Sequence, residues 1–467
     1  MDAGIVGGSS QQASLPFNAE RTVNMYAVLD QQGKKPASLY ARPGNALFGT
    51  LGSGPGRGAF AATNGRVFVV SGSQLYELLA SGTGTVLGSL LTSSGDITIA
   101  ENGAQMAICD GINLYILTYA TNVFLRVVSA NLPSAASVVF ADGYFIVNRS
   151  PTSGIFQISA PYDGFTWAAL DFATAESSPD SLLRVAVIFG QLWLFGDLSV
   201  EPWYNTGSAS FPYQRVSASS KLSAGVAAPS TVLELDNTAF WVGKDSRGTG
   251  IVYRANGYSP QRISTEAIEL RLQAAPSIST MKAITYQEAG HTFYIITGGG
   301  METALVYDVS TKLWTEWAYF NSFGNYELPL TNGLIYAFGK TLGIDRTTGK
   351  IYEQSAAYYS DNGDEIACDR IFTHIFDNGN PFLIKNLTVN FETGVGNATV
   401  TAPKAMLYLS NDGGRTFYTY YEAFIGAAGN FLTRVVWWRL GRHRQCTFRV
   451  RVTDSVKRVI TGGVFNT

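Results

Sequence analysis

One pattern recurs along most of the chain: an apolar run, a turn containing Gly or Asn, and a second apolar run. Asn64-Gly65, Asn102-Gly103 and Asp142-Gly143 are such turns, and these dipeptides favour the positive φ angles of two-residue β-hairpin loops. The pattern occupies residues 57–79, 97–117, 137–159, 185–207, 231–257, 283–317 and 332–354. Antiparallel meanders repeated about every 40 to 50 residues are typical of radially arranged blades, so the sequence predicts an all-β chain with a β-propeller of six or seven blades.

Composition and helix content agree with an all-β fold. Aromatic residues make up 13% of the chain, which also has 49 glycines. Aromatic side chains suit a pleated surface, and glycine supplies the positive φ that tight turns need. Only residues 265–272 read as a helix, and we expect this short segment to bridge two blades. Parallel βαβ units would need intervening helices that the sequence does not supply.

The pattern changes after about residue 356 to longer strands in which apolar and polar residues alternate. In 446–453, Phe448 and Val450 share one face, while Arg449 and Arg451 share the other, which is the period of a half-buried strand. This region predicts a second domain that resembles a β-sandwich. The predicted divisions are an N-terminal arm (1–45), a propeller (46–355) and a C-terminal β-sandwich-like domain (356–467).

The N-terminal arm contains two short strand candidates, 22–28 and 38–41. We expect the arm to close the propeller ring by pairing with late strands.

Charge and cysteine content limit the classes of partner and compartment. The 33 Lys and Arg residues nearly balance 35 Asp and Glu residues, giving a net charge of −2, so any nucleic-acid contact must be local. Cys109, Cys368 and Cys446 lie far apart, which favours a reducing compartment over a disulfide framework. The N-terminus does not resemble a signal peptide and no 18 apolar residues run together, so we expect no membrane insertion.

Two features associated with glycan chemistry occur, and neither predicts catalysis. Residues 410–417 match the SxDxGxTF turn of sialidases, in which Ser and Asp side chains satisfy hairpin backbone groups. Sialidases carry several such turns and an arginine cluster, whereas this chain has one turn. The densest group of acids is Asp163, Asp171, Glu176 and Asp180. Their spacing specifies no pair facing across a cleft, so we interpret them as loop residues or hairpin caps.

Metal and phosphate motifs are also missing from the sequence. His291, His374 and His443 are isolated from one another, without the spacing of a zinc site. The glycine-rich segment 52–58 lacks the Lys-Ser/Thr pair of a P-loop. We expect no catalytic residue, no cofactor and no bound metal, so the chain is predicted not to be an enzyme.

The strongest local charge lies between residues 434 and 458. Eight basic residues, Arg434, Arg439, Arg442, Arg444, Arg449, Arg451, Lys457 and Arg458, accompany a single acid, Asp454. Such a cluster could contact phosphates of DNA, which would make binding salt dependent, or pair with acids of a neighbouring subunit. The candidate interface or DNA-facing residues are Arg434, Arg439, Arg442, Arg444, Arg449 and Arg451.

The segment 433–453, TRVVWWRLGRHRQCTFRVRVT, resembles the C-terminal region of the packaged-DNA stabilisation proteins of short-tailed bacteriophages, also called tail accessory or nozzle proteins. In that family a Trp-Arg-x-Gly-Arg-x-Arg segment precedes a strand that alternates Arg with apolar residues. Further segments resemble the family in its own order: 23–25, 42–44, 192–207, 252–265 and 290–317.

The resemblance implies a propeller subunit that assembles as a ring, usually a homohexamer, below the portal and its adaptor in the phage tail. It implies a nozzle that extends the DNA channel, helps keep the packaged genome in place, takes part in genome ejection and docks a tail needle, spike or fibres. The implied partners are the portal-adaptor (head-completion) protein, those distal tail proteins and, transiently, double-stranded DNA. The implied location is the virion, after assembly in the cytoplasm of the bacterial host. The alternatives are a propeller glycosidase or sialidase, and a solitary carbohydrate-binding propeller.

Overall fold

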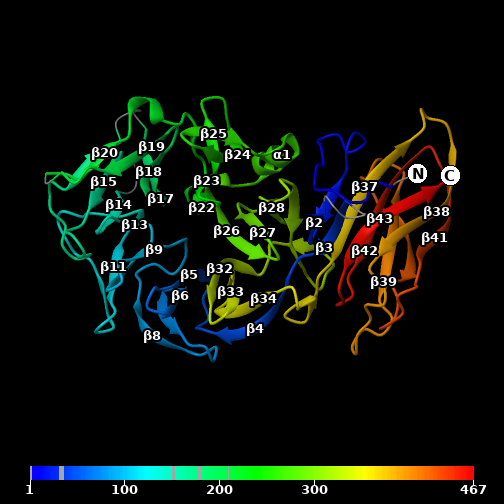
Figure 1. Ribbon diagram of the computed structural model, residues 1–467, viewed down its shortest axis with the longest axis horizontal. Coiled ribbons are helices and arrows are strands. Elements are labelled where there is room, and N and C mark those ends of the chain that lie inside the picture. Colours follow the sequence, from blue (N-terminus) through cyan, green and yellow to red (C-terminus); the bar gives the residue numbers. More distant parts are fainter. Residues whose placement is uncertain (1–2, 31–35, 150–152, 176–179, 209) are drawn as a thin grey trace.

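The computed structural model describes residues 3–30, 36–149, 153–175, 180–208 and 210–467, which form two bodies side by side (Figure 1). A ring of sheets lies on one side, a sandwich of two sheets lies on the other, and the first residues of the chain run between them. Strands predominate because apolar runs rich in β-branched and aromatic residues alternate with Gly, Asn and Asp turns. The all-β prediction is therefore confirmed.

The first four blades are four-stranded meanders that follow the chain. Blade 1 contains β5 (Gly56–Ala61), β6 (Val67–Ser71), β7 (Gln74–Leu78) and β8 (Gly84–Ser89), and blade 2 contains β9 (Thr98–Glu101), β10 (Gln105–Cys109), β11 (Leu114–Thr118) and β12 (Val123–Arg126). Blade 3 contains β13 (Ser137–Ala141), β14 (Tyr144–Asn148), β15 (Ile155–Ile158) and β16 (Phe172–Thr174), and blade 4 contains β17 (Leu182–Ile188), β18 (Gln191–Gly196), β19 (Val200–Asn205) and β20 (Tyr213–Arg215).

Three further blades bring the number within the described residues to seven. Blade 5 contains β21 (Gly225–Val226), β22 (Leu233–Leu235), β23 (Thr238–Asp245), β24 (Gly248–Asn256) and β25 (Ser259–Arg262), and blade 6 contains β26 (Met281–Glu288), β27 (His291–Gly298), β28 (Ala304–Asp308) and β29 (Trp314–Trp317). Blade 7 contains β32 (Thr331–Ala337), β33 (Lys340–Asp345) and β34 (Lys350–Ser355). Helix α1 (Glu266–Ala274) lies in the chain between blades 5 and 6.

The apolar cores of the propeller lie between neighbouring blades. Phe68 and Leu75 of blade 1, for example, share a buried cluster with Ile108 and Leu117 of blade 2. Similar clusters join blades 2 to 6 in order, and one joins blade 7 to blade 1. The cluster on the other side of blade 6 joins it to Tyr26 of the arm, with Leu334 of blade 7 packed against it. Because every blade needs a neighbour on both faces, the ring is stable only when it is closed.

A strand that begins at the end of the predicted N-terminal arm completes blade 7. β4 (Gly44–Thr50) pairs antiparallel with β34 and becomes the fourth strand of that blade. The two segments expected to close the ring by pairing with late strands, 22–28 and 38–41, form β1 (Arg21–Val23), β2 (Met25–Leu29) and β3 (Ala37–Ala41). β1 and β3 pair with C-terminal strands, β1 also pairs with β29 of blade 6, and β2 pairs with β3. Strand propensity alone does not specify which sheet edge a short strand joins.

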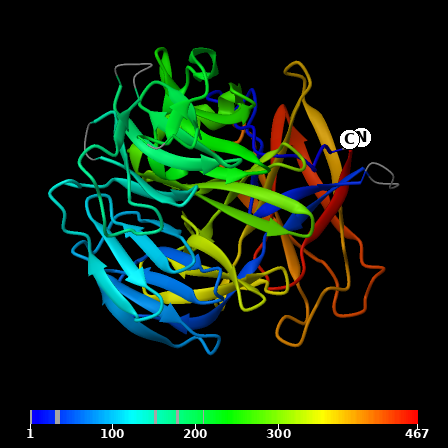
Figure 2. The same cartoon turned by 60° about the vertical axis from the view of Figure 1, so that its left-hand side comes forward.

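The C-terminal domain is a sandwich to which the arm also contributes. One sheet has the order β2, β3, β43 (Val459–Asn466), β38 (Phe382–Phe391) and β41 (Val435–His443). The facing strands are β37 (Cys368–Phe376), β42 (Gln445–Val452), β39 (Lys404–Ser410) and β40 (Tyr418–Phe424). The core between them includes Leu387, Trp437 and Phe448. The two chain ends lie together there (Figures 1 and 2), and the backbone N–H of Ala3 donates to the carbonyl of Gly463 at 2.9 Å.

A single nine-stranded sheet joins the two domains. Its order is β26, β27, β28, β29, β1, β37, β42, β39 and β40. β1 is parallel to β29 of blade 6, with Val23 opposite Glu316, and antiparallel to β37 of the sandwich. The shorter hairpins β30 (Tyr319–Phe320) with β31 (Tyr326–Glu327), and β35 (Ser360–Asp361) with β36 (Asp364–Glu365), follow blades 6 and 7. The 3₁₀ turns are η1 (Ala218–Ser220), η2 (Pro229–Thr231) and η3 (Ile278–Thr280).

A substitution at Gly49 tests how the ring is closed between blades 7 and 1. A Cβ atom at Gly49 would lie 2.0 Å from the carbonyl oxygen of Gly82, in the β7–β8 turn of blade 1, so the Gly49→Ala variant requires a backbone shift where blades 7 and 1 meet. We expect it to lower the free energy of unfolding by about 1–3 kcal/mol in urea titrations. The control Gly248→Ala adds a methyl with no atom within 4 Å and should change stability by less than about 0.5 kcal/mol. Equal effects of the two variants would contradict the closure argument.

Candidate functional site at the basic segment and the domain junction

The basic residues singled out in the sequence divide into two groups. Arg434, Arg439, Arg442 and Arg444 are exposed, just before β41, on it, or at its turn into β42. Arg449 and Arg451 lie on β42 and are half-buried. The structure therefore leaves the first four side chains available to solvent or a partner and places the other two inside contacts of the chain itself.

Arg451 links the sandwich to the propeller side of the chain. It donates to both carboxylate oxygens of Asp369 on β37, at 2.7 and 2.6 Å, and its guanidinium lies over the ring of Phe320. It also donates to the hydroxyl of Tyr326 at 3.3 Å. Burial lowers the pKa of Arg451, but the hydrogen bonds and charge of Asp369 outweigh it and raise that pKa above its ordinary value. A bidentate pair of this kind is structural and orients its partners.

Arg449 packs against aromatic rings. Its guanidinium lies 4.2 Å from the ring centroid of Tyr408 and 4.9 Å from that of Phe417. The alternation in 446–453 correctly placed Arg449 and Arg451 on one face of a strand. It did not reveal that aromatic side chains from β39, from the loop after it and from the β30–β31 hairpin cover that face.

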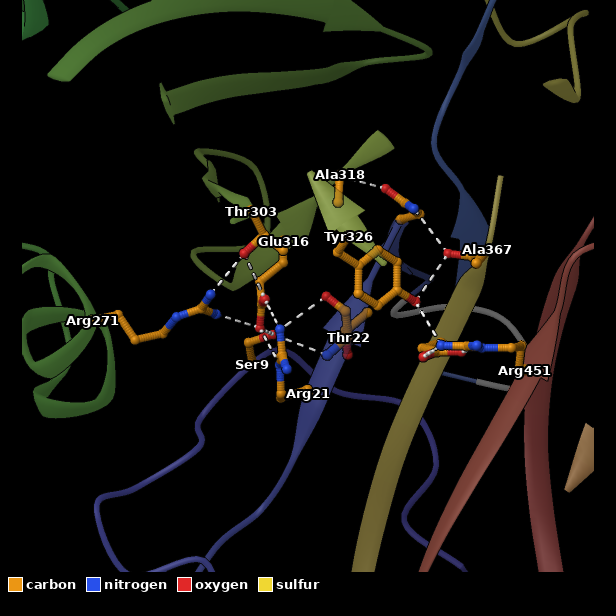
Figure 3. A network of polar contacts seen from close by, with 12 residues as sticks. Ser9, Arg21, Thr22, Arg271, Thr303, Glu316, Ala318, Tyr326, Ala367 and Arg451 are labelled. Atoms are coloured by element: carbon orange, nitrogen blue, oxygen red, sulfur yellow. Dashed lines mark hydrogen bonds and ion pairs between the residues drawn. The ribbon is translucent and has the colours of Figure 1, made fainter. Parts of the chain in front are cut away.

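Glu316 lies at the centre of a polar network where β1 meets blade 6 (Figure 3). Its side chain is fully buried and accepts two hydrogen bonds from Arg21, at 3.0 and 2.6 Å. Arg271, from helix α1, lies 2.6 Å away on the same carboxylate. Ser9 and Thr303 donate the remaining hydrogen bonds, each at 3.0 Å.

The electrostatic state of Glu316 follows from these partners. Burial alone raises the pKa of Glu316, but the charges of Arg21 and Arg271 hold it well below the ordinary range. Glu316 is therefore ionised, and its charge is balanced by two arginines, one from the arm and one from helix α1. None of these residues was predicted individually, although Glu316 lies within 290–317, one of the segments that resembles the phage family.

A second network completes the junction. Asn24 has a φ of 58°, which directs its side chain between the domains. Its amide oxygen accepts from the backbone N–H of Ala318 at 2.7 Å and from Arg42 at 2.8 Å, while its amide nitrogen donates to the carbonyl of Ala367 at 2.8 Å. Arg42 is also paired with Asp361. Two further segments that resemble the phage family, 23–25 and 42–44, thus contribute to holding propeller and sandwich together.

The other candidate residues have local roles. Asp163 accepts from Phe165 and Thr166, and Asp180 accepts from Leu198 and Ser199, so both stabilise nearby turns. Asp171 accepts through its backbone carbonyl from the N–H of Ile158, and Glu176 lies outside the described residues.

The turn at 410–417 is structural. Asp412 accepts from the backbone N–H groups of Arg415 and Thr416, at 2.9 and 3.0 Å. Hydrogen bonds from the side chains of Ser410 and Thr416 hold the pKa of Asp412 below its usual range.

The three histidines do not lie together in the structure. His291 bonds to Asp308, His374 to Thr447 and His443 to Asn411. No group of three metal-ligating side chains occurs among the described residues, and none of the helices in that part of the chain is long and apolar enough to cross a membrane.

The Glu316→Gln variant tests the junction. Loss of the carboxylate leaves two guanidinium groups with reduced compensation, so the free energy of unfolding at pH 7 should fall by about 3–5 kcal/mol. Because the folded-state pKa of Glu316 is depressed, its contribution is complete above the unfolded pKa of about 4.3 and is lost as the pH falls below it. The difference between wild type and variant should therefore shrink below pH 4 in urea titrations.

Glu422 provides the matched control. It pairs with Lys404 at 2.6 Å, but both side chains are 42% exposed, so Glu422→Gln should cost less than about 1 kcal/mol. An equally small loss for Glu316→Gln at pH 7 would show that the buried network does not hold the junction.

Comparisons with known proteins agree with this two-domain arrangement. Residues 1–346 match the family model described as Bacteriophage P22 Gp10, beta-propeller, and residues 369–466 match the one described as Bacteriophage P22 Gp10, beta-sandwich. No curated protein matches the chain.

Two solved structures resemble parts of the chain. The extracellular domain of a putative hybrid two-component system from B. thetaiotaomicron is 7% identical with a TM-score of 0.45, over 75% of this chain and 43% of that one. The chain thus spans less than half the length of that protein. The WD40 β-propeller domain of Doa1 is 12% identical with a TM-score of 0.42, over 67% of this chain and 98% of that one.

The propeller match alone covers more than half of the chain, and the sandwich match continues it in the expected order. The resemblance noted in the sequence is therefore confirmed: the chain belongs to the bacteriophage P22 Gp10 family of phage stabilisation proteins and is a structural component of a phage virion.

Proposed function

We propose that the chain assembles as a ring, most simply a hexamer, and forms a nozzle that continues the DNA channel below the portal and its adaptor. The observation that carries this proposal is the fusion of propeller and sandwich through one nine-stranded sheet. A channel part under load from packaged DNA must keep its shape. A continuous hydrogen-bonded sheet with buried ion pairs provides such rigidity better than two domains on a linker.

The surface around β41 supports a role in subunit contacts. Phe424, Phe431, Leu432 and Trp438 are exposed on β40, the loop after it and β41, with Leu432 92% and Trp438 64% exposed. The exposed arginines Arg434, Arg439, Arg442 and Arg444 belong to the same segment. Aromatic residues and Arg are enriched at protein interfaces. We propose that this surface meets a neighbouring subunit or the adaptor.

The overall charge fits a lumen that DNA traverses. The chain carries a net charge of −2, and a ring of such subunits would not accumulate a strong positive field. Multivalent phosphate contacts in a basic lumen would retain DNA and slow ejection. In this proposal the nozzle stabilises packaged DNA by closing and extending the channel, and a needle, spike or fibre docks at its far end.

The mass of the purified protein in solution, alone and mixed with the portal-adaptor assembly, tests the ring directly. Light scattering with negative-stain imaging should find about six copies per particle, free or formed on the adaptor. A monomer that ignores the adaptor would refute the nozzle and favour a solitary binding or enzymatic propeller.

Variants of the exposed arginines distinguish a protein partner from DNA. The double variant Arg442→Ala/Arg444→Ala should weaken ring assembly or adaptor docking about tenfold, and should change binding to free DNA much less. Arg449 is left intact because it packs on Tyr408 and Phe417. The control Arg126→Ala/Lys312→Ala removes two exposed charges from the propeller and should affect neither. A larger loss in DNA-binding assays than in adaptor pull-downs would reverse the interpretation.

A further inference from the structure

The blades enclose a central channel that is separate from the basic segment and from the junction. Its wall is built from β5, β9, β13, β17, β22, β26 and β32, one strand from each blade, and residues of these strands and of the turns before them line a cavity of about 330 Å³. Where the strands begin, a second cavity of about 450 Å³ is lined by residues that include Arg57, Asp96, Ser230, Lys282, Asn332 and Arg346. Lys282 lines both cavities, so they are neighbours along the channel.

The charges at this end of the channel do not balance. Arg57, Arg184, Lys282 and Arg346 line the two cavities, and among the described lining residues Asp96 is the only acid. Lys282 lies 2.6 Å from the carboxylate of Asp96. One cation is thereby compensated, and three remain without a carboxylate of their own in the channel.

Two of these three cations are held in place by uncharged groups. Arg57 donates to the carbonyl oxygens of Gly95 and Thr92, each at 2.8 Å, and is only 2% exposed. Arg346 donates to the hydroxyl of Thr297 at 2.7 Å and to the carbonyl of Pro329 at 3.2 Å. Burial lowers the pKa of Arg346 to about 10. Both guanidinium groups are therefore fixed and remain charged at neutral pH.

Arg184 is the least satisfied of the set. It lies on β17 in the channel wall, and no hydrogen bond joins its guanidinium to another described residue. Burial lowers the pKa of Arg184, with the charge of Asp96 opposing that effect. Since Asp96 already bonds to Lys282, Arg184 retains donors directed at the cavity. The Arg184 side chain is only partly buried, so its donors are accessible from the cavity, and an anion there can accept hydrogen bonds from them.

Three acids of the same inner strands, Glu101, Glu234 and Glu288 of β9, β22 and β26, lie outside the lining of the two cavities. Each accepts a hydrogen bond within the propeller, from Tyr119, from the backbone of Phe189 and from Tyr286 respectively. The cations in the lining therefore favour an anion at the end of the channel where the strands begin.

We propose that this end of the channel is a binding site for a phosphate group. Arg184 and Lys282 would supply charged donors, with Arg57 and Arg346 adding fixed positive charge. Asn332, in the lining of the neighbouring cavity, donates one amide hydrogen to the carbonyl of Gly56 and keeps a second donor. The two adjoining cavities, of about 330 and 450 Å³, accept a phosphate or a small phosphorylated compound but exclude a DNA duplex, so this site is distinct from any path of the genome.

Calorimetry on the purified full chain in phosphate-free buffer tests the site. Inorganic phosphate, pyrophosphate and adenosine monophosphate are titrated separately at constant ionic strength. Saturable binding of phosphate or pyrophosphate identifies a free oxyanion as the ligand, and binding of the nucleotide alone identifies an organic phosphate. Either result supports the site. No saturable binding of any of the three overturns it.

Variants at Arg184 assign any binding to the channel. Arg184→Gln should weaken phosphate binding at least tenfold, whereas Arg184→Lys, which keeps the charge, should retain most of it. The control Arg126→Gln, an exposed arginine on the outer strand of blade 2, should bind as the wild type does. Phosphate binding by Arg184→Gln at wild-type affinity would place the ligand elsewhere.

A stability readout separates binding from folding. Without phosphate, Arg184→Gln should melt close to the wild-type temperature, because the partly buried Arg184 guanidinium has no hydrogen bond to another described residue that the substitution would remove. With saturating phosphate, the melting temperature should rise in the wild type and not in the variant. A lower melting temperature of the variant in phosphate-free buffer would show that Arg184 serves the fold and would overturn the proposal. These measurements need no ring or adaptor, so their outcome is independent of the nozzle proposal.

Discussion

The ionised Glu316 side chain of blade 6 holds the N-terminal arm and helix α1 together through buried polar contacts. It is buried between Arg21 of the arm and Arg271 of helix α1, with Ser9 and Thr303 completing its hydrogen bonds. A buried carboxylate is tolerated only when nearly all its lone pairs are matched. The arm, blade 6 and the helix must therefore all be in position together, and the alignment of β1 between β29 and β37 depends on that arrangement.

The first fifty residues contribute strands to both domains. β4 provides the last strand of blade 7, β2 and β3 extend one sheet of the sandwich, and β1 joins the two bodies. Arg42, paired with Asp361 and bonded to Asn24, fixes the turn between these strands. Since the first residues of the chain pair with segments near its end, the final structure depends on contacts of very large sequence separation. Such contacts form late and slowly in folding.

Local patterns predicted the blades and the sandwich but could not predict partners across the chain. Turns such as Asn64-Gly65 adopt the expected positive φ at glycine, and each of the seven predicted repeat segments contains strands of one blade. The pairing partners of the arm strands were harder to predict, because a short alternating strand fits any open sheet edge. Arg449 and Arg451 show the same limit: alternation gives the face of a strand, and only tertiary structure shows what covers it.

The sequence could not predict the cluster of cations in the channel either, because its members are brought together only by tertiary structure. Arg57, Arg184, Lys282 and Arg346 belong to different blades and lie apart in the sequence. No spacing rule connects them, because the ring geometry alone brings the starts of the inner strands together. The role of Glu316 could not be predicted either, since a single acid in a strand rich in aromatic residues matches no sequence motif. Resemblance to the phage family pointed to its segment but not to its role.

The narrow span of β1 has a mechanical consequence. β1 covers only Arg21–Val23, and one residue pair, Val23 with Glu316, aligns it with blade 6. A force that pulls the two domains apart therefore acts on a three-residue strand, on the polar networks of Glu316 and Asn24 beside it, and on the packing of Tyr26 against blade 6. Below the force that breaks these contacts, the two domains move as one rigid body. Above that force, we expect the domains to separate at β1 before either domain unfolds.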